Sequence, residues 1–298
     1  MGAATTRERL ALLETAFDAG IRHFDTAPYY GYGEAERILG DFLIGKRDQV
    51  TLTTKFGIEA PAVMKSRLVN LLARRVLRLF PFLRKGLSRG AQSLSKKGAF
   101  TPADARRSLD QSLTALKTDH VDLFLLHEPT FEDAATEEMQ QFLEEEVKRG
   151  RIRAYGCGGE FSAIQSIANA KLPTAGWLQF EDNVLNRNIE AIRPCGARCI
   201  TYRTFHQALT DLACWLDADP SRYAEWERQL QVGLREDGVL AGLMQAASHF
   251  RNPGGIVLFS THRAERIHAA ARVASGNAFS LEQIQRFDDL AKSVSVGL

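Results

Sequence analysis

Short, mostly apolar runs recur along this chain, and amphipathic stretches separate them. In these stretches apolar residues return every three or four positions, which is typical of helices, whereas the short runs are typical of buried strands. We expect strands at residues 20–25, 50–54, 121–126, 152–156, 176–180, 198–202 and 255–259. We expect helices at 7–19, 33–42, 102–116, 136–148, 162–170, near 188, within 206–250, at 264–274 and at 280–294.

Alternation of strands and helices predicts an α/β fold built on a parallel sheet. Seven strands are visible, which favours a (β/α)8 TIM barrel that lacks one strand over an open doubly wound sheet. With 298 residues, the whole chain, 1–298, is expected to form a single barrel domain.

Polar residues recur where three of the predicted strands end. Asp25, Lys55 and His127 each close one of these apolar runs, and Tyr30 lies in the loop after the first. Because the carboxyl ends of parallel barrel strands share one face, these four side chains are expected to become neighbours.

The four residues could carry out proton-coupled carbonyl chemistry. A tyrosine phenol with a pKa of about 10 needs its anion stabilised before it can act as a proton donor at neutral pH. The ammonium of Lys55 could supply that charge, Asp25 could keep it protonated, and His127 could align the carbonyl group. Each residue also has an ordinary structural explanation, as a turn cap, a surface lysine or a buried histidine, but packing explains the set poorly.

The residues around these positions resemble the aldo-keto reductase family. The segment Phe24-Asp25-Thr26-Ala27-Pro28-Tyr29-Tyr30-Gly31, with Glu34 and Gly40, is similar to that family's signature. Thr53-Thr54-Lys55-Phe56-Gly57 and Asp122-Leu123-Phe124-Leu125-Leu126-His127 are similar to its lysine and histidine strands. The resemblance implies that Tyr30 is the general acid, that Lys55 and Asp25 tune it, and that His127 orients an aldehyde or ketone. Tyr29 and Phe56 are expected to line the substrate pocket.

The resemblance also implies NADP(H) as the cofactor. Gln179 and Tyr202 match family positions that contact the nicotinamide. The segment 260–267, with Thr261 and Arg266, resembles the phosphate-binding segment, and a guanidinium suits a phosphate dianion.

Some positions depart from the family's pattern. Gly158-Gly159 stands where a Ser-Asn pair usually grips the nicotinamide carboxamide, and Ala269 and Ala270 replace an acid and an amide near the adenine. Two lost hydrogen bonds at about 1 kcal/mol each would weaken cofactor binding without abolishing it, which leaves the preference for NADPH over NADH open.

The family's N-terminal hairpin and first barrel strand have no counterpart, because the chain opens on a helix. The barrel would then expose two strand edges. Either the natural start lies upstream of Met1, or the chain itself, a second copy or another partner fills the gap.

Residues 61–97 interrupt the alternation with ten Lys or Arg residues and no acidic ones. Their apolar and basic residues fall on opposite helical faces, which predicts a basic amphipathic insertion after the lysine strand. It could be a solvated helix on the barrel, a lid with affinity for anionic substrates, or an interfacial helix.

Charge, composition and cysteine spacing exclude several other classes. The net charge of +2 gives no reason to expect nucleic acid binding, and no apolar stretch is long enough for a membrane span or a signal peptide. The four cysteines form no CxxC pair and have no zinc-ligand spacing, which indicates reduced thiols, no metal site and a cytoplasmic protein.

We expect an NADPH-dependent oxidoreductase acting on a small carbonyl compound. Two alternatives remain: a non-catalytic barrel subunit with a redox or cofactor-sensing role, and a Schiff-base aldolase that uses Lys55. The physiological substrate and the oligomeric state cannot be read from the sequence.

Overall fold

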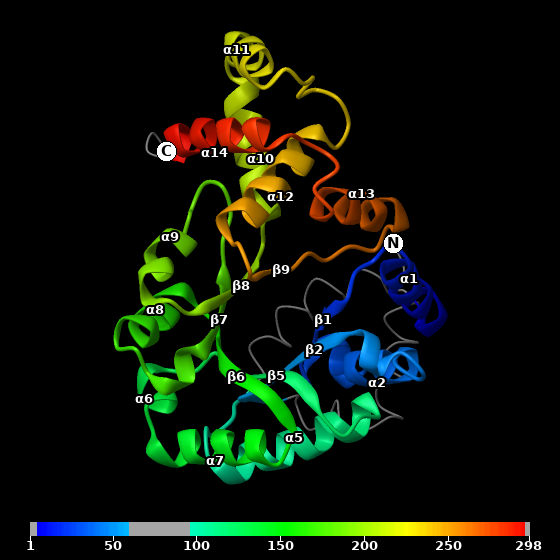
Figure 1. The fold of residues 1–298 in the computed structure, drawn as a ribbon, viewed down its shortest axis with the longest axis vertical. Helices are drawn as coiled ribbons and strands as arrows, with labels where there is room; N and C mark the ends of the chain where they lie inside the picture. The colour runs from blue at the N-terminus through cyan, green and yellow to red at the C-terminus, as the bar shows by residue number, and fades with distance from the viewer. Residues whose placement is uncertain (1–4, 60–95, 296–298) are drawn as a thin grey trace. The chain divides into compact units, whose positions relative to one another are not determined.

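The computed structural model describes residues 5–59 and 96–295, which divide into two compact units (Figure 1). The first unit comprises Met1–Phe17, Arg22–Gly158 and Leu172–Gly176. The second comprises Asp18–Ile21, Gly159–Lys171 and Trp177–Leu298. In both units parallel strands alternate with helices, so the predicted α/β class is confirmed.

The sheet of the first unit has the parallel order β1-β2-β5-β6. These strands are β1 (His23–Asp25), β2 (Thr51–Phe56), β5 (Val121–His127) and β6 (Ile152–Gly158). Its helices are α1 (Thr6–Asp18), α2 (Ala35–Phe42), α5 (Pro102–Leu116), α6 (Phe131–Ala134) and α7 (Glu137–Lys148), with short 3-10 turns η1 (Tyr30–Gly33), η2 (Arg47–Gln49) and η5 (Pro173–Gly176). The central strand β5 is buried along nearly its whole length, which explains its continuous apolar run.

Helix α5 shows how local sequence fixes an element. The Thr101 hydroxyl accepts a hydrogen bond from the Asp104 N–H at 3.2 Å, and Pro102 occupies the first helical position, where it loses no hydrogen bond. Lys117 ends the helix in the left-handed conformation, at φ 55°. The predicted boundaries, 102–116, therefore agree with the structure.

Gly40 allows α2 to lie against α5. A Cβ atom at this position would approach the backbone of Leu116, with its carbonyl carbon at 2.8 Å and its Cα at 2.9 Å. Only glycine permits this approach, so the Gly40 noted in the sequence has a packing role between two helices of the first unit.

A two-stranded antiparallel ribbon follows β2. It pairs β3 (Ile58–Glu59) with β4 (Lys96–Lys97), and the Gly98 N–H donates to the Gly57 carbonyl at 2.8 Å. The predicted amphipathic insertion at 61–97 lies outside the described residues, apart from Lys96 and Lys97.

The sheet of the second unit has the parallel order β7-β8-β9. These strands are β7 (Trp177–Glu181), β8 (Arg198–Tyr202) and β9 (Ile256–Val257). Its helices are α8 (Phe161–Asn169), α9 (Ile189–Ile192), α10 (His206–Asp217), α11 (Pro220–Leu230), α12 (Val239–Arg251), α13 (Ala264–Ala274) and α14 (Leu281–Ser295), and η6 (Arg193–Cys195) is a 3-10 turn. Apolar residues of α10, α11, α12 and α14 form one core cluster.

A buried ion network joins the loop after β7 to α12 and α14 within this unit. Arg251, 2% exposed, contacts Asp182 at 2.9 Å and Asp288 at 2.8 Å, and Arg187 contacts Asp288 at 2.8 Å. Burial on its own would disfavour ionised Asp288, but its hydrogen bonds and charge pairing with Arg187 and Arg251 hold the pKa of this carboxyl below its usual value.

Every predicted strand is present, with shifts at some ends. Lys55 lies inside β2, which continues to Phe56, and the strand expected at 255–259 is only β9. The helical stretch expected at 206–250 is three helices, because Asp219 and Pro220 start α11 and Gly238 precedes α12. In the described ranges none of the helices combines the length and apolar character needed to cross a bilayer, and the four cysteine thiols are free.

Candidate active site

Three of the predicted residues lie on neighbouring strands of the first unit. Asp25 pairs in register with Thr53, and Lys55 pairs with Leu125, two residues before His127. Since paired residues of parallel strands point to the same side and side chains alternate along a strand, Asp25, Lys55 and His127 share one face near the carboxyl ends. Tyr30 follows β1 at the start of η1.

Lys55 is at the centre of this group. Its side chain is 1% exposed, and Nζ donates to Asp25 Oδ1 and to the Thr26 carbonyl, the latter at 3.1 Å. The Asp25 side chain is 12% exposed. A buried ammonium needs such partners, because an unpaired charge in the protein interior costs several kcal/mol.

Tyr30 lies between Lys55 and His127. Lys55 Nζ is 5.0 Å from the centroid of the Tyr30 ring, and the His127 ring meets the Tyr30 ring edge to face, with centroids 5.8 Å apart. The structure therefore brings together the four residues predicted for catalysis.

Burial and mutual charge set the protonation states of the group. Burial lowers the pKa of Lys55, and the charge and hydrogen bond of Asp25 oppose that shift. Burial, with a smaller contribution from the Lys55 charge, lowers the pKa of His127 to about 3. The imidazole is therefore neutral around pH 7, and it can donate or accept one hydrogen bond at each ring nitrogen according to its tautomer.

The backbone after β2 fits tightly beneath His127. Gly57 has φ 116°, and a Cβ atom here would lie 2.9 Å from the His127 carbonyl oxygen, so glycine is required. Phe56 stacks on Phe124, with centroids 5.0 Å apart and an interplanar angle of 17°. It points to the opposite side of β2 from Lys55 and is 2% exposed, which argues against its predicted role in lining a substrate pocket. Tyr29 is half-buried, with its ring 6.0 Å from that of Tyr30.

The predicted nicotinamide contacts, Gln179 and Tyr202, belong to the second unit. Gln179 is buried on β7, and Tyr202 ends β8, where it pairs in register with Glu181. Gln179 is two positions before Glu181, so its side chain lies on the same face of this sheet as that of Tyr202. The Tyr202 hydroxyl is 3.5 Å from the Gly159 carbonyl oxygen.

Gly158 and Gly159 use their backbone groups within the protein. The Gly158 carbonyl accepts from the Glu128 N–H at 2.7 Å, and the Gly159 N–H donates to the Gln179 carbonyl at 3.0 Å. With no side chains, they cannot replace the amide and hydroxyl that the family resemblance leads us to expect here.

The predicted phosphate contacts lie at the start of α13. Thr261 accepts a hydrogen bond from the Arg263 N–H at 3.1 Å. Arg263 and Arg266 are exposed, and neither forms an ion pair with any carboxylate in the described ranges. Two guanidinium groups beside a helix N-terminus fit an anionic phosphate group.

The alanines after Arg266 differ in their environment. Ala269 is exposed, whereas Ala270 is buried and its carbonyl accepts from Gln245 Nε2 at 3.0 Å. Ala270 thus lies where α12 and α13 pack together, and this close packing explains its small side chain.

Two features near the predicted residues, one in each unit, were not predicted. Glu36 is a buried carboxylate on α2 that bonds to Thr54, next to Lys55. The sequence does carry a signal for its burial. Glu36 lies three and four positions before Leu39 and Gly40, so it falls on the same buried face of the helix. In the second unit Arg203, which follows Tyr202, has φ 63° and contacts Glu181 at 2.8 Å. A left-handed arginine has no sequence signal of comparable strength.

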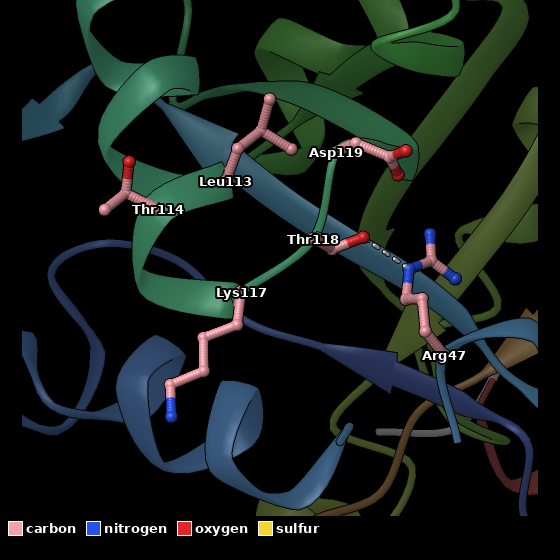
Figure 2. Close-up of a pocket in the computed structure, with 6 residues that line it drawn as sticks. All are labelled: Arg47, Leu113, Thr114, Lys117, Thr118 and Asp119. Carbon is pink, nitrogen blue, oxygen red and sulfur yellow. Dashed lines mark hydrogen bonds between the residues drawn. The ribbon is translucent and has the colours of Figure 1, made fainter. Parts of the chain in front are cut away.

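A separate hollow lies at the other end of the first unit's strands. Figure 2 shows its lining by Arg47, Leu113, Thr114, Lys117, Thr118 and Asp119, and its volume is about 620 Å³. Arg47 Nε donates to Thr118 Oγ1 at 3.1 Å, and Lys117 Nζ contacts Asp41 at 2.7 Å. Both cations are already paired, and the hollow precedes β5 rather than following it, so it is not the candidate active site.

Comparisons with known proteins show which sequences and folds this chain is similar to. The sequence model of the Aldo/keto reductase family matches residues 2–292. Among curated proteins, D-threo-aldose 1-dehydrogenase from Pseudomonas sp is 35% identical over 164 residues, which cover 52% of this chain and 45% of that protein. A 6-dehydroglucose reductase from Agrobacterium fabrum is 31% identical over 172 residues, which cover 55% of this chain and 49% of that protein. The chain thus spans about half the length of these curated relatives.

Solved structures share the fold at low sequence identity. An aldo-keto reductase from Bacillus halodurans in its holo form has a TM-score of 0.67 at 18% identity and covers 97% of this chain and 89% of its own. An aldo-keto reductase from Klebsiella pneumoniae in complex with NADP and acetate has a TM-score of 0.62 at 20% identity and covers 97% and 87%. These likenesses confirm the predicted barrel-type fold class.

Proposed function

Since this chain belongs to the Aldo/keto reductase family, we propose that it is an NADPH-dependent reductase of aldehydes or ketones. The observation that carries the proposal is the buried Lys55 ammonium, which contacts Asp25 and faces the Tyr30 ring at 5.0 Å. A cation in this position stabilises the anion that Tyr30 becomes after it gives up its proton.

In the proposed reaction Tyr30 acts as the general acid. Its phenol donates a proton to the carbonyl oxygen while the carbonyl carbon accepts a hydride, and the product is an alcohol. The remaining phenolate is held beside Lys55 until it is reprotonated. Neutral His127, edge-on to Tyr30, hydrogen-bonds the carbonyl oxygen and orients it.

NADPH supplies the hydride in this proposal. The exposed Arg266, with Thr261, is assigned to the 2′-phosphate, and Gln179 and Tyr202 are assigned to the nicotinamide. The exposed Arg266 guanidinium at the start of α13, which has no carboxylate partner within residues 5–59 and 96–295, is the feature of the second unit that best fits a phosphorylated cofactor. The glycines at 158 and 159 predict a weaker hold on the carboxamide.

The contacts of Lys55 favour this reaction over a Schiff-base aldolase. A Schiff base requires a free amine lone pair, whereas Lys55 Nζ donates hydrogen bonds to Asp25 and to the Thr26 carbonyl. The Lys55 side chain is also only 1% exposed, so a substrate would have little access to it. The proposal includes two further points. Tyr29, which is half-buried, lines the substrate pocket, and the protein acts in the cytoplasm.

The test is NADPH oxidation by the folded protein with aldehydes of two kinds. We choose 4-nitrobenzaldehyde as a generic substrate, and an open-chain hydroxyaldehyde because the two curated relatives described above are named for sugars. Turnover with either aldehyde, together with quenching of protein fluorescence by NADPH, is the expected result. A folded sample that neither binds NADPH nor consumes it would overturn the proposal.

A further inference from the structure

Glu36 is a buried acid whose place in the first unit calls for an explanation. It lies in the first turn of α2, and its side chain is 5% exposed. The Thr54 hydroxyl donates to Glu36 Oε1 at 2.6 Å, from a threonine that is itself fully buried. A buried carboxylate is costly, so hydrogen bonds or a nearby cation must offset its burial.

Lys55, the residue after Thr54, is a cation whose charge favours ionised Glu36, although less strongly than the hydrogen bond from Thr54. Successive side chains of a strand point to opposite faces, so Glu36 reaches β2 from the helix side while Asp25 contacts Lys55 on the other side. The charge of Glu36 acts on Lys55 in the same direction as that of Asp25, favouring the ammonium form. Asp25 is partly exposed to solvent, whereas Glu36 is not.

The charged and polar groups that surround Glu36 come from α5, β2 and α2 itself. Burial has the largest effect and raises the pKa of Glu36 above its usual value, and the hydrogen bond from Thr54 and the charge of Lys55, both on β2, oppose that shift only in part. The charged residues of α5 pair elsewhere: Asp104 with Arg107, Arg106 with Glu145 and Glu146, Asp110 with Arg151, and Lys117 with Asp41. On α2 itself, Arg37 and Asp41 pair with each other at 3.2 Å.

Gly40 lets α2, the helix that carries Glu36, approach α5 closely. A Cβ atom at Gly40 would lie 2.8 Å from the Leu116 carbonyl carbon.

We propose that Glu36 is a positioning residue of the candidate active site: its buried carboxylate is the second negative charge, after Asp25, that holds Lys55 as an ammonium ion. This inference rests on the proposed function of Lys55 beside Tyr30. Under this inference, a residue on the helix-facing side of β2 supports the proton transfer by Tyr30 and Lys55 on the opposite side of the strand.

The test compares Glu36→Gln with Thr54→Val. Glutamine keeps the volume and an acceptor for Thr54 but removes the charge, whereas valine removes the hydrogen bond and leaves the charge of Glu36 in place. The titration of Lys55 is followed by NMR of its side-chain nitrogen, a readout that needs no enzymatic activity. We expect the Lys55 midpoint to move to lower pH in Glu36→Gln and to move less in Thr54→Val.

A structural role alone predicts a different pattern. Both variants would then lose thermal stability while the Lys55 midpoint stayed where it is in the wild type, and this result would overturn the inference. Should Glu36→Gln fail to fold, Glu36→Leu, which also removes the charge and has a similar volume, takes its place, and an unchanged Lys55 midpoint in that variant would have the same meaning.

The pH profile of kcat/KM connects the titration to catalysis. In Glu36→Gln the alkaline limb is expected to move to lower pH, with a loss of about fivefold at pH values on that limb, since one nearby charge contributes on this scale. If the proposed function itself were wrong, turnover would be absent in every variant but the NMR shift of Lys55 would remain. The two failures can therefore be told apart.

Discussion

The two units of this chain hold their candidate functional residues in opposite ways. In the first unit Lys55 and Asp25 are buried and in contact, and Tyr30 and His127 pack against each other. In the second unit Arg263 and Arg266 are exposed, without a carboxylate partner in the described ranges. The difference follows from their proposed tasks: groups that move a proton must be preorganised, whereas groups that bind a cofactor phosphate must be open to it.

The largest expected effect comes from removing the buried ammonium. Lys55→Met should lower kcat/KM by about 10³-fold, because the Tyr30 anion loses its adjacent cation and Asp25 loses its partner. Lys148→Met is the matched control, since Lys148 is an exposed lysine in the last turn of α7 and its loss should be neutral. Steady-state kinetics on both variants measures the difference, and equal activities would break the contrast between the units.

The rigidity of the first unit can be tested at Gly40. Gly40→Ala forces a Cβ into the Leu116 backbone and should destabilise the fold by about 1–3 kcal/mol. Gly176→Ala adds a Cβ that meets only the Tyr155 carbonyl oxygen, at an ordinary 3.6 Å, and should change the free energy of unfolding much less. Urea denaturation of the two variants is the measurement, and similar losses would argue against the role given to the α2–α5 contact.

In the second unit the expected effect is on binding alone. Arg266→Ala should raise the NADPH dissociation constant about tenfold and leave that of NADH unchanged, because only NADPH carries the 2′-phosphate. Arg272→Ala removes another exposed arginine, in the last turn of the same helix, and is expected to bind both cofactors like the wild type. An equal loss for NADH and NADPH would show that Arg266 acts in some other way.

A smaller effect concerns pH and stability. The folded protein keeps His127 neutral down to about pH 3, whereas the unfolded chain protonates it near 6.5. Between these values the unfolded state binds the extra proton, so stability is lost as pH falls below 6.5. His127→Asn should reduce the slope of unfolding free energy against pH in that window by up to about 1.4 kcal/mol per pH unit.

Thermal or urea denaturation at several pH values measures that slope. Exposed His268→Asn should keep the wild-type slope. A His127→Asn variant with an unchanged slope would mean that the folded protein protonates the imidazole in the same pH range as the unfolded chain.

The sequence predicted the first unit's site better than the second's for a physical reason. Asp25, Lys55 and His127 sit on strands whose apolar runs are unmistakable, and parallel register then brings them together without further information. Arg203 and Glu181 meet through a left-handed residue, which the sequence pattern does not reveal. The substrate role of Phe56 stays a prediction, and the sequence did not show that β2 continues past Lys55, which places this ring on the other side of the strand.

Helix boundaries show the same limit. Thr101-Pro102 and Lys117 mark α5 clearly, since a cap and a left-handed end are local features. The division of 206–250 into three helices was also locally encoded, by Asp219-Pro220, but its apolar residues belong to one shared core and read as continuous.

The most direct test of the account measures cofactor binding and a single turnover on the same Tyr30→Phe sample, with Tyr29→Phe as the neighbouring control. We expect Tyr30→Phe to bind NADPH like the wild type and to reduce the aldehyde at least about 100-fold more slowly, since only the proton donor is gone. Tyr29→Phe should keep most of the rate. A Tyr30→Phe variant that turns over at the wild-type rate would contradict the central claim that the buried Lys55 pair serves Tyr30.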